Sequence, residues 1–283
     1  MPHATTRRRV VRVAVDADGV HARPARPDTL AVEEPLEIRL GTTGEPAPFT
    51  VTMRTPGHDL ELALGFLVAE GVVRSPADVL GARHCPDASR DADGEPTYNV
   101  VEVVLAPGVA APEAARHRHV SSACGICGTE TIEAVRARSA FDVSTDDVRV
   151  SAEVLAGLPD RLRTAQRVFA TTGGLHAAGL FTPAGDLVTV REDVGRHNAV
   201  DKVVGASLEA GRVPLTGHVL QVSGRASFEL VQKAWTAGCP VLAAVSAPSS
   251  LAVELAEEAG MTLVGFSRGG SFNVYTRPDR LGL

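Results

Sequence analysis

The chain of 283 residues contains few aromatic residues and few cysteines. Aromatic side chains make up only 4% of the residues, so the core must consist mainly of Val, Leu and Ala. Cysteine occurs four times, at Cys85, Cys124, Cys127 and Cys239. Four cysteines in a chain of this length exclude a small scaffold stapled by disulfides, and this usage is typical of a reducing compartment.

The sequence also has no long hydrophobic run and no excess of positive charge. No window approaches the roughly 18 uncharged apolar residues of a membrane span, and the basic start, Arg7 to Arg12, is not followed by the apolar stretch of a secretory signal. The net charge of −6 argues against general binding of nucleic acids. We therefore expect a soluble cytoplasmic protein with neither nucleic acid nor membrane as a partner.

Apolar residues at 44% and charged residues at 22% are close to the averages of globular proteins. The length fits one large domain or two ordinary ones. The stretch from Pro107 to Ala115 is rich in Pro, Gly and Ala and is the best candidate for a linker. We predict a small α+β domain over residues 1–112 and an α/β domain over residues 113–283.

In the first part, alternating apolar residues predict strands, and one apolar stripe at helical spacing predicts a helix. Pro35 favours an edge position or a bulge for its strand. Asp59 is the expected N-cap of the helix, and Gly71 is the expected residue just after its end. The predicted strands are Arg8–Val15, Leu30–Leu40, Phe49–Arg54 and Tyr98–Leu105.

In the second part, Ser151 is expected to cap a helix, and another helix is expected from Arg196 to Ala210. Strands are expected at Val168–Thr172, Gly179–Phe181 and Leu187–Arg191. The last third alternates strand and helix with short loops, which predicts a parallel sheet. Its elements are Val219–Val222, Ala226–Ala237, Val241–Val245, Ser249–Ala259 and Met261–Phe266.

The segment Ser121–Gly128 places Cys124 and Cys127 three residues apart, with glycines between and after them. Glycines permit close approach by a partner, and a following helix N-terminus would favour the thiolate. Three interpretations compete: a zinc site, a dithiol redox site, and a thiol that carries a group covalently. A zinc site needs about four ligands, and no second C-x-x-C is present.

Three predicted strands of the last third end in small, hydroxyl-bearing or arginine residues. These ends are Ser223–Arg225, Ser246–Ser250 and Ser267–Gly270. In an open α/β sheet, ligands bind beyond the carboxyl ends of the strands, and such residues suit phosphate groups. The three ends together favour a nucleotide-like or phosphorylated ligand.

The segment Arg191–Lys202 (REDVGRHNAVDK) gathers charged and polar residues where a strand meets a helix. It is either a solvated helix start with Asp193 as the cap or part of a site that also uses Glu192, His197 and Asn198. His176, in a glycine-containing loop, is a candidate active-site group, although a lone histidine is more often structural.

Taken together, these residues resemble the formate dehydrogenase accessory sulfurtransferase family. The resemblance covers most of the chain, and its most specific parts are Cys124–Gly128 (CGICG) and Arg191–Lys202. The supporting segments are Val32–Arg39, Thr55–Gly71, Gly173–His176, Val222–Arg225, Gly265–Gly270 and Asn273–Tyr275.

The resemblance implies a cytidine-deaminase-like fold for the C-terminal domain. It also implies that Cys124 accepts sulfur from a cysteine desulfurase as a persulfide, with Cys127 as a possible partner. The sulfur would pass to the molybdenum (or tungsten) bis-guanine-dinucleotide cofactor that formate dehydrogenase requires. By the same resemblance, this cofactor would contact Phe266, Ser267, Arg268, Gly269, Gly270 and Ser271. The two dinucleotide halves of such a ligand make a homodimer attractive.

Two rival functions are weighed against this one. A zinc hydrolase of the deaminase type would show H-x-E followed by P-C-x-x-C, but Ala178 stands in the place of the glutamate and Ala123 in that of the proline. We therefore expect no metal site. A chaperone that only escorts the cofactor is the other rival, and it would form no persulfide.

Overall fold

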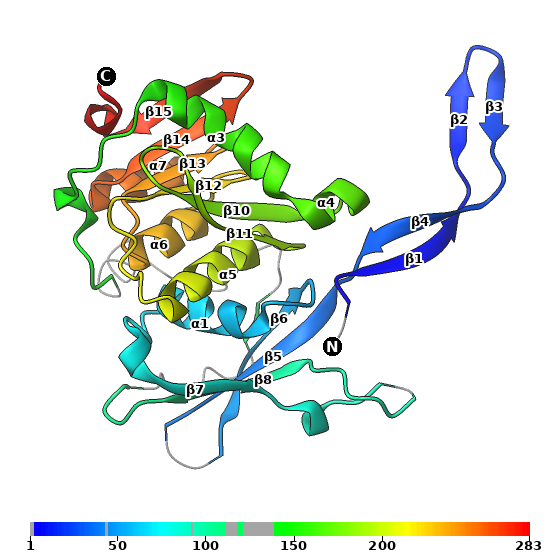
Figure 1. Ribbon diagram of the computed structural model, residues 1–283, viewed down its shortest axis with the longest axis horizontal. Helices are drawn as coiled ribbons and strands as arrows, with labels where there is room; N and C mark the ends of the chain where they lie inside the picture. The colour runs from blue at the N-terminus through cyan, green and yellow to red at the C-terminus, as the bar shows by residue number, and fades with distance from the viewer. Residues whose placement is uncertain (1–2, 43–44, 92, 111–117, 121–138) are drawn as a thin grey trace.

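The computed structural model describes residues 3–42, 45–91, 93–110, 118–120 and 139–283, which form a body with two β-sheets and a protruding arm (Figure 1). The predicted mixed α/β class is confirmed. The likeness to the cytidine deaminase fold stays a prediction. Within the described residues, no helix is long and apolar enough to cross a membrane.

The larger sheet has six strands and lies in the C-terminal part of the chain. In spatial order they are β11 (Leu187–Asp193), β10 (His176–Phe181), β12 (Val219–Val222), β13 (Val241–Ala244), β14 (Thr262–Arg268) and β15 (Ser271–Thr276). The central pairs β12–β13 and β13–β14 are parallel, as predicted. Strand β15 was not expected, and it pairs antiparallel with β14 across the turn at Gly269 and Gly270.

Helices cover both faces of this sheet. On one face, Leu220, Leu242 and Leu263 pack in a core with α5 (Arg196–Glu209), α6 (Phe228–Thr236) and α7 (Ser250–Ala259). On the other face, Val219, Val241 and Val264 pack against α3 (Ala152–Ala165). Neighbouring residues of each strand therefore pack in two different cores, because side chains along a strand alternate between the two faces of the sheet. Ser151 caps α3 as predicted, accepting a hydrogen bond from the Val154 amide at 3.3 Å.

The smaller sheet has five strands and packs one face on α1 (Asp59–Ala69). In spatial order they are β7 (Val79–His84), β8 (Val100–Leu105), β5 (Glu34–Gly41), β6 (Ala47–Arg54) and β9 (Arg118–Val120). Short 3-10 turns lie at Pro76–Asp78, Pro86–Ala88, Val143–Thr145 and Pro278–Leu281. Strand β5 lies between β8 and β6, but at Pro35 it has only β6 beside it, so Pro35 takes the edge position that was one of the two predicted alternatives. Pairing with β8 begins only at Glu37, so no strand needs an amide hydrogen from Pro35 on that side.

The two halves of the body meet where α1 crosses α5, and the helix backbones touch at two glycines. A Cβ on Gly65 would lie 1.8 Å from the Asp201 carbonyl oxygen, and a Cβ on Gly205 would lie 1.8 Å from that of Glu61. No side chain fits at either place. The sequence therefore allows this crossing only because both positions are glycine.

The predicted cap of α1 is also corrected. Asp59 is the first helical residue, and the N-cap is His58 in a left-handed conformation with φ of 58°. The Asp59 carboxylate is unavailable for capping because it accepts two hydrogen bonds from Arg54. Gly71 lies just after the helix with φ of 72°, as predicted.

The prediction of a strand at Val168–Thr172 is wrong, because these residues form α4 (Arg167–Thr172). The carboxylate of Glu192 accepts hydrogen bonds from the amides of Val168 and Phe169, at 2.9 and 2.7 Å, and so caps the start of the helix. Gly173 ends it with φ of 65°. A cap supplied from a distant strand outweighs the β-branched residues that favour extended backbone.

The arm is built from β1 (Thr5–Val10), β2 (Val13–Asp16), β3 (Gly19–Ala22) and β4 (Arg26–Ala31). β1 pairs with β4, and β2 with β3. The single strand predicted at Arg8–Val15 is therefore divided between β1 and β2. In Figure 1 the arm projects away from the body.

Candidate functional site

A pocket of about 550 Å³ lies at the carboxyl ends of the parallel strands. Its floor includes Ser223 after β12, Val245 after β13 and Arg268 at the end of β14. One wall comes from α3, α4 and the following loop, through Pro159, Asp160, Leu162, Arg163, Gln166, Phe169, Gly173, Gly174 and Leu175. His176 and Val194 complete the lining. The sequence prediction that ligands bind beyond these strand ends thus coincides with a real cavity.

The three segments after the strands lie side by side, as predicted. Backbone hydrogen bonds join Ser246 to Gly224 at 3.2 Å and Phe266 to Ser246 at 3.1 Å, so the sheet pattern continues beyond the strands. Within these segments Ser223 and Arg268 reach the pocket. Arg225 is exposed and does not line it.

His176 and Ser223 form the polar end of the pocket. The Nδ1 atom of His176 lies 3.5 Å from the Ser223 hydroxyl oxygen, which accepts a hydrogen bond from the Ala177 amide at 2.9 Å. Burial lowers the pKa of His176, and the nearby charges of Arg196 and His197 lower it further. The imidazole is therefore neutral at pH 7 and can both donate and accept a hydrogen bond.

Two exposed arginines and one carboxylate, that of Asp160, line the pocket, so positive charge prevails. The Arg163 guanidinium carbon stacks 4.0 Å from the centre of the Phe169 ring, and that of Arg268 lies 5.7 Å from the centre of the Phe266 ring. Among the described residues, no carboxylate forms an ion pair with either guanidinium. Stacked arginines without an acidic partner are suited to bind phosphate groups.

The predicted cofactor-binding segment, residues 266–271, comprises the end of β14, the turn at Gly269 and Gly270, and the first residue of β15. Phe266, Gly269 and Gly270 have φ of 52°, 59° and 76°, and only the glycines adopt such values without strain. Arg268 alone of the six lines the pocket, while Gly269, Gly270 and Ser271 are exposed. Ser267 is completely buried, and its hydroxyl has no hydrogen-bond partner among the residues that the structure describes.

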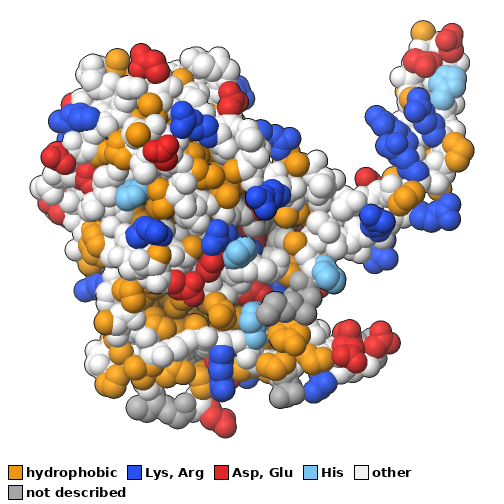
Figure 2. All heavy atoms as spheres, viewed as in Figure 1, with side chains coloured by type: hydrophobic (Ala, Val, Ile, Leu, Met, Phe, Trp, Pro, Cys, Tyr) orange, Lys and Arg blue, Asp and Glu red, His pale blue; other side chains and the backbone are white. Residues whose placement is uncertain are grey.

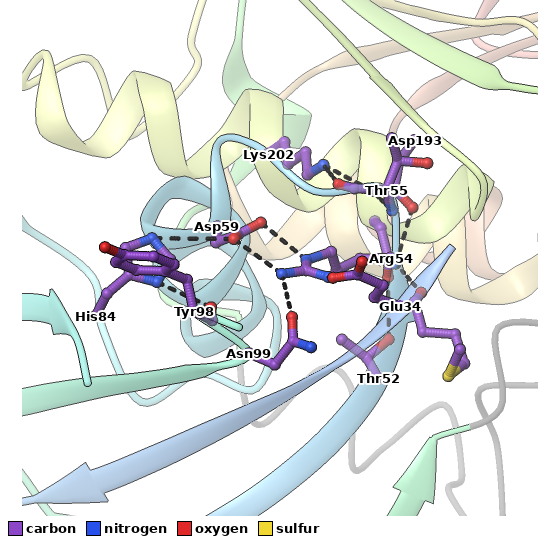
Figure 3. A network of polar contacts seen from close by, with 12 residues as sticks. Glu34, Thr52, Arg54, Thr55, Asp59, His84, Tyr98, Asn99, Asp193 and Lys202 are labelled. Atoms are coloured by element: carbon purple, nitrogen blue, oxygen red, sulfur yellow. Dashed lines mark hydrogen bonds and ion pairs between the residues drawn. The ribbon is translucent and has the colours of Figure 1, made fainter. Parts of the chain in front are cut away.

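Apart from Val194, which lines the pocket, several side chains of the charged segment 191–202 bind residues next to β6 of the smaller sheet (Figure 3). Asp193, fully buried, accepts a hydrogen bond from the Thr55 amide at 3.1 Å and pairs with Lys202 at 2.7 Å. Lys202 also donates to the Thr55 carbonyl at 2.8 Å, and Asn198 donates to the Met53 carbonyl at 2.7 Å. These residues join the two halves of the body.

Arg54 is another buried charge, whose partners all lie in the N-terminal half of the body, and the sequence analysis did not single it out. Its side chain is completely buried and donates to both oxygens of Asp59, at 3.1 and 3.2 Å, to Asn99 at 2.8 Å and to Glu34 at 3.3 Å (Figure 3). The available signal was an arginine at the end of an alternating apolar strand. A charge there requires a buried partner.

Of the other residues in the charged segment, His197 contacts α6 and its preceding loop. Its Nε2 atom lies 2.8 Å from a Glu229 carboxylate oxygen and 3.1 Å from the Ser227 hydroxyl. Asp201 binds Lys233 of α6 through both carboxylate oxygens, at 2.7 and 2.8 Å. Burial raises the pKa of Asp201, and Lys233 opposes this effect.

Cys124 and Cys127 lie outside the described residues. The two other cysteines are described, and neither is a ready nucleophile. Burial and a hydrogen bond to Glu102 raise the pKa of Cys85 to about 11, and burial raises that of Cys239 to about 12. Both are therefore protonated thiols at neutral pH. No group of three or more His, Cys, Asp and Glu in the described part of the chain could hold a metal ion.

Known proteins resemble this chain over nearly its whole length. The model of the FdhD/NarQ family matches residues 31–282. The chain is 56% identical to a protein from Streptomyces coelicolor named sulfur carrier protein FdhD, over 100% of this chain and 98% of that protein. Proteins of the same name from Mycobacterium tuberculosis and Sulfolobus acidocaldarius are 56% and 44% identical, over 99% and 97% of this chain and 100% and 99% of theirs.

A solved structure has the same fold. It is the crystal structure of a putative formate dehydrogenase accessory protein from Desulfotalea psychrophila, with a TM-score of 0.71 and 23% sequence identity. The match covers 97% of this chain and 99% of that one.

Proposed function

The chain belongs to the FdhD/NarQ family, and from that premise we propose that it is a cytoplasmic sulfur carrier in the maturation of formate dehydrogenase. A cysteine desulfurase is the proposed sulfur donor. The proposed sulfur acceptor is the molybdenum (or tungsten) bis-guanine-dinucleotide cofactor, which is bound as cargo and goes to formate dehydrogenase. The observation that carries this proposal is a basic, phosphate-suited pocket in a chain with a glycine-flanked C-x-x-C motif.

Cys124 is the proposed carrier. Its thiolate attacks the outer sulfur of the desulfurase persulfide; a new sulfur–sulfur bond forms on Cys124, and the desulfurase cysteine leaves as a thiolate. Cys85 and Cys239 are poor candidates for this step, because thiols with pKa values of about 11 and 12 are protonated at neutral pH. Cys127, three residues from the carrier in the sequence, is the proposed group that releases or relays the sulfur.

The pocket is the proposed site for part of the cofactor. Its volume of about 550 Å³ suits one nucleotide-sized portion of a ligand. Arg163 and Arg268 would bind the phosphates of one dinucleotide arm, and His176 and Ser223 would donate or accept hydrogen bonds at the other end. The family resemblance assigns residues 266–271 to cofactor binding, and Arg268 is the one of these six that lines the pocket. A cofactor with two such arms favours a homodimer.

Formate dehydrogenase activity in the host tests this function. A strain that lacks the gene should recover activity with the wild-type protein and with Cys85→Ala, but not with Cys124→Ala. Equal recovery with both variants would contradict the proposal. The Cys85 variant is the matched control, because it removes a thiol that the transfer does not use.

The rival deaminase-type hydrolase has a structural obstacle. Ala178, which stands where the catalytic glutamate would be required, is completely buried in the core. One tightly bound zinc ion per purified chain would revive that function. The cofactor-escort function predicts that Cys124→Ala keeps full activity, so the same host assay separates it from the carrier.

A further inference from the structure

Gln166 lies between the last residue of α3 and the first residue of α4, and it lines the pocket. The residue is only 4% exposed. Its backbone is engaged, because its amide donates to the Arg163 carbonyl at 3.3 Å and its carbonyl accepts from the Ala170 amide at 3.2 Å. Its side-chain carboxamide, by contrast, forms no hydrogen bond with any residue that the structure describes. The described part of the protein therefore leaves a buried polar side chain unpaired at the pocket.

The position of Gln166 offers its side chain a structural task, but another residue performs it. Gln166 is the N-cap of α4, and an N-cap side chain normally accepts hydrogen bonds from amides of the first turn. Here the Glu192 carboxylate binds these amides, at Val168 and Phe169. An unpaired carboxamide that is removed from water destabilises the protein, because its hydrogen bonds to water are lost. A ligand that pairs with the carboxamide would offset this loss.

The carboxamide of Gln166 presents a hydrogen-bond acceptor beside a donor. Guanine presents the complementary pair on adjacent atoms, because its O6 accepts a hydrogen bond and its N1–H donates one. The two groups can therefore form a ring of two hydrogen bonds. Phosphate oxygens only accept, so they would leave the carboxamide oxygen unpaired. The side chain is thus suited to a base and not to a phosphate group.

The arginines of the pocket are placed differently from Gln166. Arg163 and Arg268 are exposed, and Figure 2 shows basic side chains at the surface over α3 and α4, which form the pocket wall. A ligand with an anionic end and a neutral end can therefore keep its phosphates near the surface while its base reaches the buried carboxamide. The volume of about 550 Å³ is enough for one nucleotide.

We propose that Gln166 binds the guanine base of one dinucleotide arm through two hydrogen bonds of its carboxamide, while the arginines of the pocket bind the phosphates. This assignment rests on the proposed function, because the cofactor supplies the guanine. It places base recognition on a residue outside the segment 266–271, at the junction of the two helices that form the pocket wall.

Calorimetric titration of the full-length protein tests the proposal with two probes, guanosine diphosphate and inorganic pyrophosphate. Gln166→Met keeps the length of the side chain and removes the carboxamide. It should weaken the binding of guanosine diphosphate about tenfold and that of pyrophosphate less than about twofold, since only the base loses hydrogen bonds. Gln232→Met is the matched control, because Gln232 is also buried but does not line the pocket. The control should bind both probes as the wild type does.

Two further measurements separate a role in binding the base from other roles. Arg268→Ala should weaken both probes by similar factors, because both contain the pyrophosphate group. The urea concentration at half unfolding should not fall in Gln166→Met, because the carboxamide has no partner to lose among the described residues. A value clearly below that of the wild type would give Gln166 a structural role and contradict the proposal.

Unchanged affinity of Gln166→Met for guanosine diphosphate, when the wild type binds it, would overturn the proposal. Equal losses for the two probes would also overturn it, since Gln166 would then act on the phosphates. A wild type that binds neither probe would contradict the cofactor pocket itself. The sulfur-carrier function is measured separately, by the gain of one sulfur atom on the Cys124 peptide, so its failure and the failure of this assignment can be told apart.

Discussion

The interface between the two sheets and the pocket at the strand ends both contain charged residues. Those at the interface are buried and paired, whereas the arginines of the pocket are exposed. At the interface and in the adjoining N-terminal half, Asp193, Lys202 and Arg54 are at most 1% exposed, and each has a partner of opposite charge. At the pocket, Arg163 and Arg268 are exposed, and among the described residues they form no ion pair. Paired buried charges hold a fold in one arrangement, whereas unpaired exposed arginines are available for an anion.

Because of this difference, changes at the interface should reduce stability, and changes at the pocket should reduce binding alone. The segment 191–202 shows why this distinction matters. Its many charged residues indicate that it is important, but they do not indicate whether its role is structural or in binding. The structure assigns most of it to the interface, through Asp193, Asn198 and Lys202.

The largest effect on stability is expected from Arg54→Met. Removing the guanidinium leaves the carboxylate of Asp59 buried without its main partner, which costs about 3–5 kcal/mol. The free energy of unfolding in urea measures it. Arg225→Met, at an exposed arginine outside the pocket, should stay within about 0.5 kcal/mol of the wild type. A loss below about 1 kcal/mol for Arg54→Met would contradict our description of the buried charges.

The next effect is expected at the helix crossing. Gly205→Ala places a Cβ against the Glu61 carbonyl and should cost about 1–3 kcal/mol. Gly157→Ala in α3 is the control, since its Cβ would meet only the Arg161 side chain, at 4.0 Å. That variant should be more stable than the wild type by up to about 1 kcal/mol, because alanine favours the helix. Equal losses from the two variants would show that the crossing is not tightly packed.

A smaller effect should appear on acidification. Burial alone would raise the pKa of Glu61, but hydrogen bonds from Arg191 and His58 outweigh it and hold the pKa at about 2. A carboxyl whose pKa falls on folding stabilises the fold above its unfolded pKa, near 4.5, and this contribution is lost as the pH falls towards 2.

Between pH 5 and pH 2, the wild type should therefore lose about 1–2 kcal/mol more than Glu61→Gln, after allowance for solvent screening. Urea unfolding of both proteins at each pH provides the measurement. Parallel stability curves for the two proteins would exclude Glu61 as a contributor.

The smallest effect on stability is expected from Arg268→Ala, within about 0.5 kcal/mol of the wild type, because the side chain is exposed. Its effect should appear in binding instead. Guanosine diphosphate, a fragment of the proposed cofactor, should bind about tenfold more weakly, since one charge-assisted hydrogen bond is lost. Calorimetric titration measures this, with Arg225→Ala as the control. An Arg268 variant that is less stable, or that binds guanosine diphosphate as tightly as the wild type, would contradict the difference that we describe between the pocket and the interface.

Much of the fold could be predicted because local patterns and tertiary structure agree. The last third alternates buried strands and capped helices, so its parallel order followed from the sequence. The helix at Arg167–Thr172 could not be predicted, since its cap comes from Glu192, more than twenty residues away. Strand β15 was missed because its residues alternate weakly between exposed and half-buried positions.

The site was predictable in part for the same reason. Ser223 and Arg268 follow strands of one sheet, so their meeting follows from the topology. Arg163 and Phe169 belong to the wall formed by α3 and α4, and that wall depends on the helix that the sequence did not reveal. The crossing at Gly65 and Gly205 was equally hidden, because two isolated glycines in helices carry no local sign of their contact.

The most direct test of the sulfur-carrier function is the mass of the peptide that contains Cys124. The purified protein should be incubated with a cysteine desulfurase and cysteine, digested without reductant and compared with Cys124→Ala. Our account predicts a gain of one sulfur atom on that peptide, reversible by a thiol reductant, and none on the Cys85 or Cys239 peptides. A Cys124 peptide that stays unmodified after incubation with an active desulfurase would contradict this account.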